Sequence, residues 1–567
     1  EKYGRDENEE YHREPFAADV SEGKSDPVYM AHAYHTKVPH KAIMRYILHY
    51  TKPGDIVLDG FSGTGMTGVA AYQCEDEKVV KSLGYEVSNK YVKVNDSIIS
   101  EIGNRKCILN DLAPIASLIS RNYNLPVDVT KFVNIAEKIL NLLEQEYGWM
   151  FETEHELDGK TLVNSQGDPI KGVINYTVWS DVFYCSNCSE ELVFWDVAVD
   201  LAANKLKETF ICPYCKAELT KNKLEKVWET YYDSSIGKII NRAKQTPVLI
   251  NYSVGNQRFD KKPSSSDIEI ITKIDNLNSS AWFPTDELPD GYNTEQPKKS
   301  HGITNIHHLY TKRNILVLSK ALEEIKKYNI PILFSWLTSA MIRTTKMYKF
   351  TLDRKMGTVS GTYYVPSLWT ENSPFKLLRR KIQDFKKVNY NNNYSTVISN
   401  GSQTAIPLKE NSIDYIFTDP PFGGNLMYSE LNFLWESWFR VFTNNKPEAI
   451  VNNVQRKTLN DYQVLMEECF RNYYRVLKPG RWMTVEFSNS QASVWNAIQE
   501  AIQKAGFVIA NVSALDKKQG SFKAVTTTTA VKQDLVISAY KPKQENIEKM
   551  RREQNTEESA WTFVRQH

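Results

Sequence analysis

Short apolar runs that end beside an acidic residue recur along the chain and predict the strands of a parallel sheet. Residues 56–58 precede Asp59, and residues 107–109 lie just before Asp111. A third run ends just before Asp419. Continuous apolar runs of this length are typical of strands that are buried on both faces. The pattern therefore predicts an α/β fold with these acids at the carboxyl edge of the sheet, where such sheets bind ligands.

Apolar residues at helical spacing predict helices beside these strands. Ile43, Ile47 and Leu48 share one face of a helix that follows residues 33–39. Between residues 310 and 327 the same spacing recurs at Ile315, Leu318, Leu322 and Ile325. The stretch 251–301 is rich in turn-forming residues and is interpreted as loop or linker.

A glycine-rich turn connects the first predicted strand to a helix that begins near Met66. It consists of Asp59, Gly60, Phe61, Ser62, Gly63, Thr64 and Gly65. The pattern differs from the dinucleotide-binding fingerprint, because the strand ends in an acid and the glycine spacing is different. Such glycines let backbone amides approach a ligand at a helix N-terminus, and the Asp59 carboxylate suits a cationic or hydroxyl-bearing ligand. The alternative is a purely structural turn.

The segment after the third strand suits a planar amino group. It reads Asp419, Pro420, Pro421 and Phe422. Because prolines have no N–H and hold the chain extended, nearby carbonyls stay free to accept hydrogen bonds. The Asp419 carboxylate and the Pro420 carbonyl would fix an exocyclic –NH2, while Phe422 offers a ring face to a base lifted out of its stack. The alternative is a proline-rich turn after a buried strand.

Two cysteine pairs predict a structural metal site. They are Cys185 with Cys188 and Cys212 with Cys215, each spaced as Cys-x-x-Cys. Four thiolates fill a tetrahedral Zn²⁺ shell and leave no position for water. Four of seven cysteines in such pairs indicate a reducing compartment rather than a disulfide framework.

The composition is that of a globular enzyme, with 41% hydrophobic and 24% charged residues among 567. A formal net charge of +2 means that any nucleic-acid affinity must come from a local cationic face. Basic residues mixed with aromatics are densest between 343 and 387, although a solvated helix face is the alternative interpretation. The longest apolar run, near 330–342, is too short and too polar to span a bilayer. We expect a cytoplasmic protein that has no membrane segment.

Together these motifs resemble the DNA amino-methyltransferases. Residues 58–65 are similar to their S-adenosylmethionine-binding loop, and residues 419–422 to their catalytic tetrapeptide. The family loop usually begins Asp-Pro-Phe, so Gly60 replaces a proline. Residues 110–114, 477–487 and 532–540 are similar to later parts of the same sheet. With the cysteine pairs, the chain resembles bacterial adenine-specific DNA methylases that carry a zinc ribbon.

The resemblance implies a Rossmann-like methyltransferase sheet with a large insertion. Its expected parts are an N-terminal segment and cofactor half (1–125), an inserted target-recognition region with the ribbon at about 180–220 (126–309), a catalytic half (310–541) and a charged tail (542–567). S-adenosylmethionine and Zn²⁺ are the implied cofactors. Asp111 is expected to bind the ribose, with Glu86 as the alternative. Lys37 or His35 is expected near the methionine end of the cofactor, where a solvated charge is equally consistent with the sequence.

The resemblance further implies methyl transfer to N6 of an adenine flipped out of double-stranded DNA. N4-cytosine methylation is the nearest alternative, followed by RNA guanine-N2 methylation and by a non-catalytic zinc-ribbon DNA-binding protein. The chain has no Pro-Cys dipeptide, which excludes the nucleophile expected for cytosine C5 methylation. No nuclease motif is evident, so a role in restriction-modification or phage defence would require a partner protein.

Overall fold

A computed structural model describes residues 11–277, 281–390, 394–517, 534–545 and 548. The chain forms two compact units. Unit 1 comprises Glu1–Val127, Lys387–Asn432 and Val441–His567, and unit 2 comprises Asp128–Lys386 and Phe433–Arg440. Lys532, Gln533 and most of the expected tail, 542–567, lie outside the described residues. No described helix is both long and apolar enough to cross a membrane.

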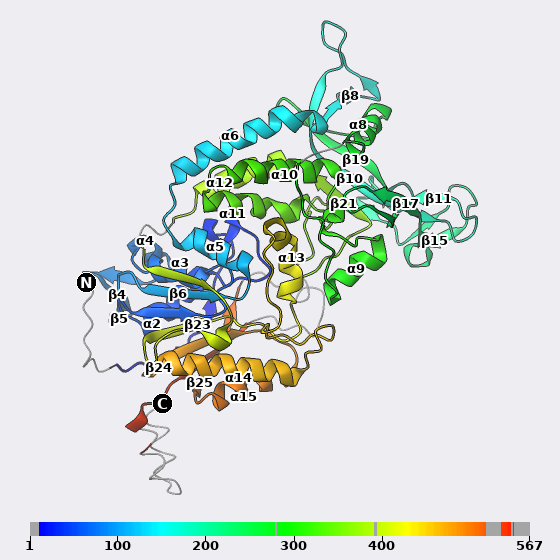
Figure 1. The fold of residues 1–567 in the computed structure, drawn as a ribbon. Coiled ribbons are helices and arrows are strands. Elements are labelled where there is room, and N and C mark those ends of the chain that lie inside the picture. The colour runs from blue at the N-terminus through cyan, green and yellow to red at the C-terminus, as the bar shows by residue number, and fades with distance from the viewer. Residues whose placement is uncertain (1–10, 278–280, 391–393, 518–533, 546–547, 549–567) are drawn as a thin grey trace. The chain divides into compact units, whose positions relative to one another are not determined.

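Unit 1 is built on an eight-stranded sheet with the order β1-β25-β26-β24-β23-β2-β6-β22. Figure 1 labels β6, β23, β24 and β25 of this sheet. The run from β24 to β22 is parallel, and β26 is antiparallel to both of its neighbours. The strands are β1 (Val20–Ser21), β2 (Ile56–Asp59), β6 (Lys106–Asp111), β22 (Thr396–Asn400), β23 (Ile413–Thr418), β24 (Leu477–Phe487), β25 (Val508–Asp516) and β26 (Asp534–Tyr540). This topology confirms the predicted α/β fold with a parallel sheet.

Helices cover both faces of this sheet because its strands are apolar on both sides. In β23, Tyr415 and Ile416 are adjacent and therefore point to opposite faces. Tyr415 stacks on Tyr50 of α2 at 5.1 Å, whereas Ile416 packs with Phe470 of α14 in the main apolar cluster. The helices of unit 1 are α1 (Pro27–Ala31), α2 (His40–Tyr50), α3 (Met66–Gln73), α4 (Glu77–Ser82), α5 (Pro114–Asn124), α14 (Leu459–Val476) and α15 (Ala492–Lys504).

The strand order places the candidate site. Strand β2 is central in the sheet. The next two strands of this sheet in the sequence, β6 and β22, lie on one side of β2, and the following two, β23 and β24, lie on its other side. The carboxyl ends of β2, β6 and β23 therefore meet where the order reverses, which is where open α/β sheets bind ligands. Asp59 and Asp111 are the last residues of β2 and β6, and Asp419 follows β23. A small antiparallel sheet of β3 (Glu86–Ser88), β4 (Tyr91–Val94) and β5 (Ser97–Glu101) lies between β2 and β6 in sequence.

Unit 2 is organised around the long strand β10 (Lys171–Tyr184), which belongs to a seven-stranded sheet. The other strands of that sheet are β7 (Glu152–Glu154), β11 (Glu191–Val193), β16 (Glu225–Lys226), β19 (Gln245–Val254), β20 (Gln257–Lys261) and β21 (Leu368–Asn372). Short two-stranded pairs are β8 (Glu156–Leu157) with β9 (Lys160–Thr161), β12 (Val199–Asp200) with β13 (Lys205–Leu206), β14 (Thr209–Ile211) with β15 (Glu218–Thr220), and β17 (Trp228–Asp233) with β18 (Lys238–Ala243).

The helices of unit 2 include a group that the sequence assigned to the catalytic half. They are α6 (Val129–Tyr147), α7 (Phe194–Ala198), α8 (Ser265–Asp275), α9 (Tyr292–His301), α10 (Lys312–Lys326), α11 (Pro331–Met341) and α12 (Pro374–Lys386), and α13 (Tyr428–Phe439) ends in this unit. The expected boundary at residue 310 does not coincide with this division. Arg313 of α10 is buried and donates to Glu371 of β21 and Thr177 of β10, and β21 pairs with β10. These contacts hold residues 310–386 in unit 2.

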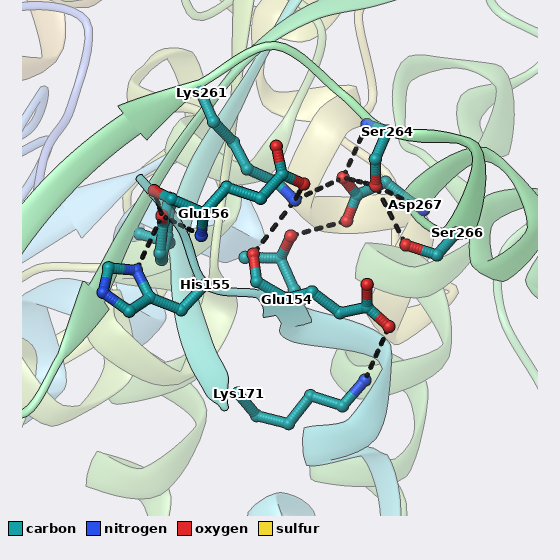
Figure 2. Close-up of polar contacts among 10 residues, drawn as sticks. Glu154, His155, Glu156, Lys171, Lys261, Ser264, Ser266 and Asp267 are labelled. Carbon is teal, nitrogen blue, oxygen red and sulfur yellow. Dashed lines mark hydrogen bonds and ion pairs between the residues drawn. The ribbon is translucent and has the colours of Figure 1, made fainter. Parts of the chain in front are cut away.

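A buried ion network connects β8, β20 and α8 in unit 2 (Figure 2). The Lys261 ammonium contacts Glu156 Oε1 at 2.6 Å, Asp267 Oδ2 at 3.0 Å and the Glu154 carbonyl at 3.0 Å. The side chains of Lys261 and Asp267 are only 5% and 3% exposed. Burial raises the pKa of Asp267, but hydrogen bonds from Thr153 and its other partners outweigh burial and lower it below the usual value. The carboxylate is therefore stabilised in the folded state.

We expect Lys261→Met to lower the free energy of unfolding by about 3 kcal/mol, because it leaves a buried carboxylate unpaired. Urea unfolding followed by tryptophan fluorescence measures the change. Lys171→Met is the matched control: Lys171 is 47% exposed and lies 3.7 Å from Glu154, so its loss should cost under about 1 kcal/mol. Since the pKa of Asp267 is depressed in the folded protein, the Lys261–Asp267 pair contributes to the free energy of unfolding at neutral pH. This contribution is lost as the pH falls below about 4. Equal losses in the two variants would contradict this account.

Candidate active site

A pocket opens at the carboxyl edge of the unit 1 sheet. Its lining includes Asp59, Asp111 and Asp419 from the three strand ends, together with the glycine-rich turn. Gly60, Phe61, Ser62, Gly63 and Thr64 of that turn line the pocket, and so does Lys37. Glu86 does not line it and is exposed on β3. The structure therefore brings Asp111, and not Glu86, to the pocket.

The turn is held by the two acids that end β2 and β6. Gly63 has φ +49 and Gly65 has φ +78, a region that favours glycine. Asp111 Oδ2 accepts a hydrogen bond from Gly63 N at 2.7 Å, and Oδ1 accepts one from Ala113 N at 2.8 Å. Asp59 accepts from Phe61 N at 3.1 Å and from Thr67 Oγ1 at 2.5 Å. Both carboxylates therefore shape the turn as well as face the pocket.

Burial dominates the electrostatics of these two acids. It raises the pKa of Asp59 to about 7, although the hydrogen bonds from Thr67 and Phe61 act in the opposite direction. It raises the pKa of Asp111 to about 6, against the hydrogen bonds from Ala113 and Gly63. The charge of Asp111 also raises the pKa of Asp59. A ligand that brings hydroxyl donors or a positive charge would therefore be favoured between them.

The crowding around Gly60 explains why this chain has no proline there. Gly60 N donates to the hydroxyl of Tyr473 at 2.9 Å, and proline has no such donor. An added Cβ at Gly60 would lie 2.1 Å from Gln403 Oε1 and 2.5 Å from the Tyr473 hydroxyl. Gly65 is equally confined, since a Cβ would lie 2.3 Å from Ser120 Oγ. The turn thus depends on glycine for space as well as for its backbone conformation.

Lys37 and His35 differ in their relation to the pocket. The Lys37 side chain is buried, and its ammonium donates to the His32 carbonyl at 2.8 Å and to the Tyr29 carbonyl. These bonds orient Lys37 at the pocket wall. His35 does not line the pocket, and its Nε2 contacts Asn432 Oδ1 at 3.0 Å. Burial lowers the pKa of His35 to about 4, so it is neutral at physiological pH.

The segment that follows β23 combines fixed and unpartnered polar groups. The Pro421 carbonyl accepts from the Tyr462 hydroxyl at 2.8 Å, and the Phe422 carbonyl from Asn489 Nδ2 at 2.8 Å. Asp419 Oδ1 is buried without a hydrogen-bond partner. Among the described residues, no donor contacts the Pro420 carbonyl. Protein contacts therefore hold the end of the segment and leave acceptors at its start.

Asp419 and Pro421 line the pocket, whereas Pro420 and Phe422 do not. The Phe422 ring packs edge-on against Phe487 at 5.2 Å and is half-buried. Burial raises the pKa of Asp419 to about 7; Lys517 lowers it, and Asp534 and Asp59 raise it. An acid with this pKa can both accept a hydrogen bond and hold a proton near neutral pH.

Several residues that line the pocket were not predicted from the sequence. The Gln403 amide is buried, and neither its oxygen nor its nitrogen has a partner. Gln403 follows β22, so its position after a strand end was a usable signal. Tyr428 of α13 and Glu448 also line the pocket. Glu448 accepts from Ser429 N at 2.9 Å, and no local motif marks it.

The four paired cysteines come together in unit 2. Their sulfur atoms all lie within 4.8 Å of one another, with 3.7 Å between Cys185 and Cys215 and 3.8 Å between Cys188 and Cys212. A tetrahedral zinc site with Zn–S bonds of about 2.3 Å has sulfurs about 3.8 Å apart. The donor set and its spacing therefore fit Zn²⁺.

A second cluster in unit 2, Asp233 with His307 and His308, does not fit a metal. Both Nε2 atoms lie at hydrogen-bond distance from Asp233 Oδ2, at 2.7 and 2.8 Å. His308 Nδ1 accepts from the backbone N–H groups of Thr304 and Asn305 at 3.3 Å. In a neutral ring the proton then lies on Nε2, which donates to Asp233 and has no lone pair for a metal.

The chain resembles known proteins in the parts that form the pocket. Residues 4–97 and 413–564 match the sequence model of a family described as DNA methylase (N6_N4_Mtase). These segments contain the glycine-rich turn and residues 419–422. The match supports a DNA methyltransferase activity in unit 1. A comparison with curated protein sequences found no match.

Solved structures resemble a limited part of the chain. The antibiotic-resistance methyltransferase Kmr is 12% identical over 26% of this chain and 62% of its own, with a TM-score of 0.16. The 16S rRNA (adenine(1408)-N(1))-methyltransferase from Catenulisporales acidiphilia is 11% identical over 30% and 73%, with a TM-score of 0.16. A SAM-dependent methyltransferase from Methanosarcina mazei is 10% identical over 27% and 71%, with a TM-score of 0.16. The aligned region spans less than two thirds of Kmr, and no inference about this chain rests on these likenesses.

Proposed function

We propose that this chain is an S-adenosylmethionine-dependent DNA methyltransferase that acts on N6 of adenine in a flipped-out base. One observation carries the proposal: the unpartnered Asp419 carboxylate lies in the same pocket as Asp59, Asp111 and the glycine-rich turn. The proposed cofactor site and the proposed acceptor for the substrate amine therefore lie in one pocket. The family match to residues 4–97 and 413–564 supports the same activity.

The residues that would hold S-adenosylmethionine are those that shape the turn. Asp111 would accept from the ribose hydroxyls, and Asp59 would favour the positive end of the ligand. The backbone of Ser62, Gly63 and Thr64 comes close to the ligand because two glycines keep the turn narrow. When bound, S-adenosylmethionine supplies an electrophilic methyl group. Lys37, at the wall of the pocket, would attract the cofactor's carboxylate.

Asp419 and Pro420 would prepare the acceptor amine. The Asp419 carboxylate and the Pro420 carbonyl each accept one N–H, which fixes the –NH2 plane and increases electron density on its nitrogen. The N–C bond forms as the S–C bond breaks, and the amine then loses a proton, which Asp419 Oδ1 can take. No covalent enzyme intermediate is needed. Phe422 would contact the face of the base.

Adenine is favoured over cytosine because the tetrapeptide begins with Asp419, whereas N4-cytosine enzymes more often have serine at that position. RNA guanine-N2 methylation and a non-catalytic zinc-ribbon DNA-binding protein are less favoured hypotheses, which the product and activity measurements below distinguish from DNA methylation.

The proposed partner is double-stranded DNA, with unit 2 as the target-recognition part. Among the basic residues of the 343–387 segment, Lys381 is buried beside Asp384, whereas Arg379 is exposed in a surface ion pair with Glu144. Action in restriction-modification or phage defence would require a separate nuclease subunit in the cytoplasm.

Zn²⁺ is proposed as a structural ion of unit 2, held by Cys185, Cys188, Cys212 and Cys215. Cys185 and Cys212 are buried within an apolar cluster that includes Phe183. A closed shell of four thiolates has no open position, so the ion would stabilise the fold and take no part in the reaction.

Asp111→Asn should weaken S-adenosylmethionine binding by about 10- to 100-fold, because a hydrogen bond to a charged group contributes about 1.5–3 kcal/mol. Isothermal titration measures the affinity, and thermal unfolding of the ligand-free variant reports on the turn. The matched control is Glu86→Gln, which should bind like wild type because Glu86 is remote from the pocket lining. A loss for Glu86→Gln and none for Asp111→Asn would reverse the assignment.

Asp419→Asn should lower methyl transfer by roughly 10³-fold, because the new amide N–H opposes the N–H groups of the substrate amine. Tritiated methyl transfer to duplex DNA, followed by nucleoside mass spectrometry, measures rate and product. Binding of cofactor and DNA should stay within a few-fold of wild type. N4-methylcytosine as the product would correct the base, and no transfer by folded, cofactor-bound wild type to DNA or RNA would reject the proposed activity.

One zinc per chain should copurify, and elemental analysis of Cys185→Ser and Cys212→Ser should show it reduced or absent. Cys74→Ser is the matched control, since Cys74 is also buried but lies in unit 1 and bonds the Ala70 carbonyl. It should keep the metal. Full zinc content in both ribbon variants would show that the ligands are wrong.

A further inference from the structure

Four charged side chains lie in succession along the carboxyl edge of the unit 1 sheet. The strand order β25-β26-β24-β23 makes these strands neighbours. Lys517 follows β25, Asp534 begins β26, Glu486 is next to last in β24, and Asp419 follows β23. Because β26 is antiparallel to its neighbours, its first residue lies at the same edge as their last residues. The strand register agrees, since Leu515 pairs with Asp534 and Thr418 with Val485.

Direct contacts join three of these groups into one buried ion cluster. Lys517 Nζ lies 2.8 Å from Asp534 Oδ2 and also contacts Glu486 Oε1. The side chains of Lys517 and Glu486 are 10% and 0% exposed. Glu486 is fully buried, so its contact with the Lys517 ammonium is an important compensation for the removal of its carboxyl group from water. Asp419 is a third carboxyl group at this edge, and the Lys24 ammonium also interacts with the charges of Lys517, Asp534 and Glu486.

The charged groups around Asp419 shift its pKa in opposite directions. Burial raises the pKa of Asp419 to about 7, Lys517 lowers it, and Asp534 and Asp59 raise it. Asp419 in turn raises the pKa of Glu486, which burial already holds well above its usual range. Asp419 also raises the pKa of two tyrosine hydroxyls on neighbouring helices, Tyr29 and Tyr428. Among the described titratable groups that face Asp419, Lys517 is the one cation that acts on it.

We propose that Lys517 is a positioning residue for the methyl transfer. Its ammonium, held in place by Glu486 and Asp534, keeps Asp419 in the carboxylate form that accepts a hydrogen bond from the substrate amine. A protonated Asp419 would carry an O–H donor on one oxygen and would be a weaker acceptor through the other, so it would orient and polarise the amine less well than the carboxylate. The inference rests on the proposed function and adds to it a group outside the pocket lining.

A purely structural role for Lys517 leads to a different outcome. If Lys517 only neutralises Glu486, its loss should lower the amount of folded protein, and activity should fall by the same factor at every pH. If it acts on Asp419, the acid limb of the pH–rate profile must move. The profile therefore separates the two roles.

The experiment measures single-turnover methyl transfer to duplex DNA from pH 5.5 to 9.5 with saturating cofactor. For Lys517→Met the acid limb should move up by about one pH unit, because loss of a nearby opposite charge raises a carboxyl pKa. Activity should approach that of wild type at the alkaline end. Lys517→Arg should restore the wild-type limb. Asp534→Asn should move the limb down, since it removes a like charge and leaves the Lys517–Glu486 pair.

Lys478→Met is the matched control. Lys478 of β24 pairs with buried Asp414 of β23 at 2.5 Å, so it joins β24 to β23 at the end opposite to Asp419. Asp419 lies five positions after Asp414, which corresponds to about 16 Å of strand. The control should lower the unfolding temperature and shift the acid limb far less than Lys517→Met. An equal shift in both variants would overturn the proposal.

A second readout does not need activity. In protein labelled with ¹³C at the aspartate carboxyl carbons, the Asp419 resonance is assigned by its absence in Asp419→Asn. Its titration should move up in Lys517→Met and down in Asp534→Asn. Unchanged titration in both variants overturns the inference even if the wild type methylates DNA. Shifts of the stated signs in a protein that transfers no methyl would show that Lys517 acts on Asp419 and would reject the proposed function, and with it the positioning role. If Lys517→Met does not fold, Lys517→Gln, which keeps a polar group against Glu486 and Asp534, takes its place, and an unchanged Asp419 titration in that variant overturns the inference.

Discussion

The structure of unit 1 depends on the burial of carboxylates at one edge of a parallel sheet. Parallel strands bring their carboxyl ends to the same side, so Asp59, Asp111 and Asp419 converge there. Removing such groups from water is unfavourable unless donors or cations compensate them. The glycine-rich turn supplies donors for Asp59 and Asp111. Asp419 differs from these two acids, because its Oδ1 is buried without a hydrogen-bond partner.

The same constraint explains why the pocket needs so many glycines and aromatic residues around it. The hydroxyl of Tyr473 accepts from Gly60 and also contacts Thr418, so one residue of α14 joins the turn to the end of β23. The amide of Gly60 and the small volume at this position are both used. The glycine-rich turn and the segment after β23 are therefore positioned by a shared contact rather than independently.

In unit 2, buried charged groups are compensated by pairing with one another. Arg313 and Glu371 are buried together, and Trp179 donates to the same carboxylate at 2.8 Å. A buried pair of this kind is costly to break, because either partner alone would remain charged and unsolvated. It joins α10 to the sheet around β10, so the region after residue 310 folds with the insertion. The four cysteines close a separate small cluster in this unit.

Local patterns in the sequence were sufficient for the fold class and for most of the candidate site. Apolar runs ending beside Asp59, Asp111 and Asp419 predicted parallel strands and the edge at which they end, because strand periodicity and turn chemistry are encoded within a few residues. The cysteine spacing likewise predicted which four sulfurs would meet. These features need no knowledge of distant contacts.

Other features were decided only by the tertiary structure. Which of Asp111 and Glu86 lines the pocket depended on which strand joins the central sheet. The Arg313–Glu371 pair keeps the residues after 310 in unit 2, away from the expected boundary. Gly60 and Tyr473 are 413 positions apart in the chain. The Lys517 charge acts on Asp419 although strands β26 and β24 lie between the two strands that these residues follow. Such contacts have no local signature, because the energy that selects them is the burial of one polar group against another brought there by the rest of the fold.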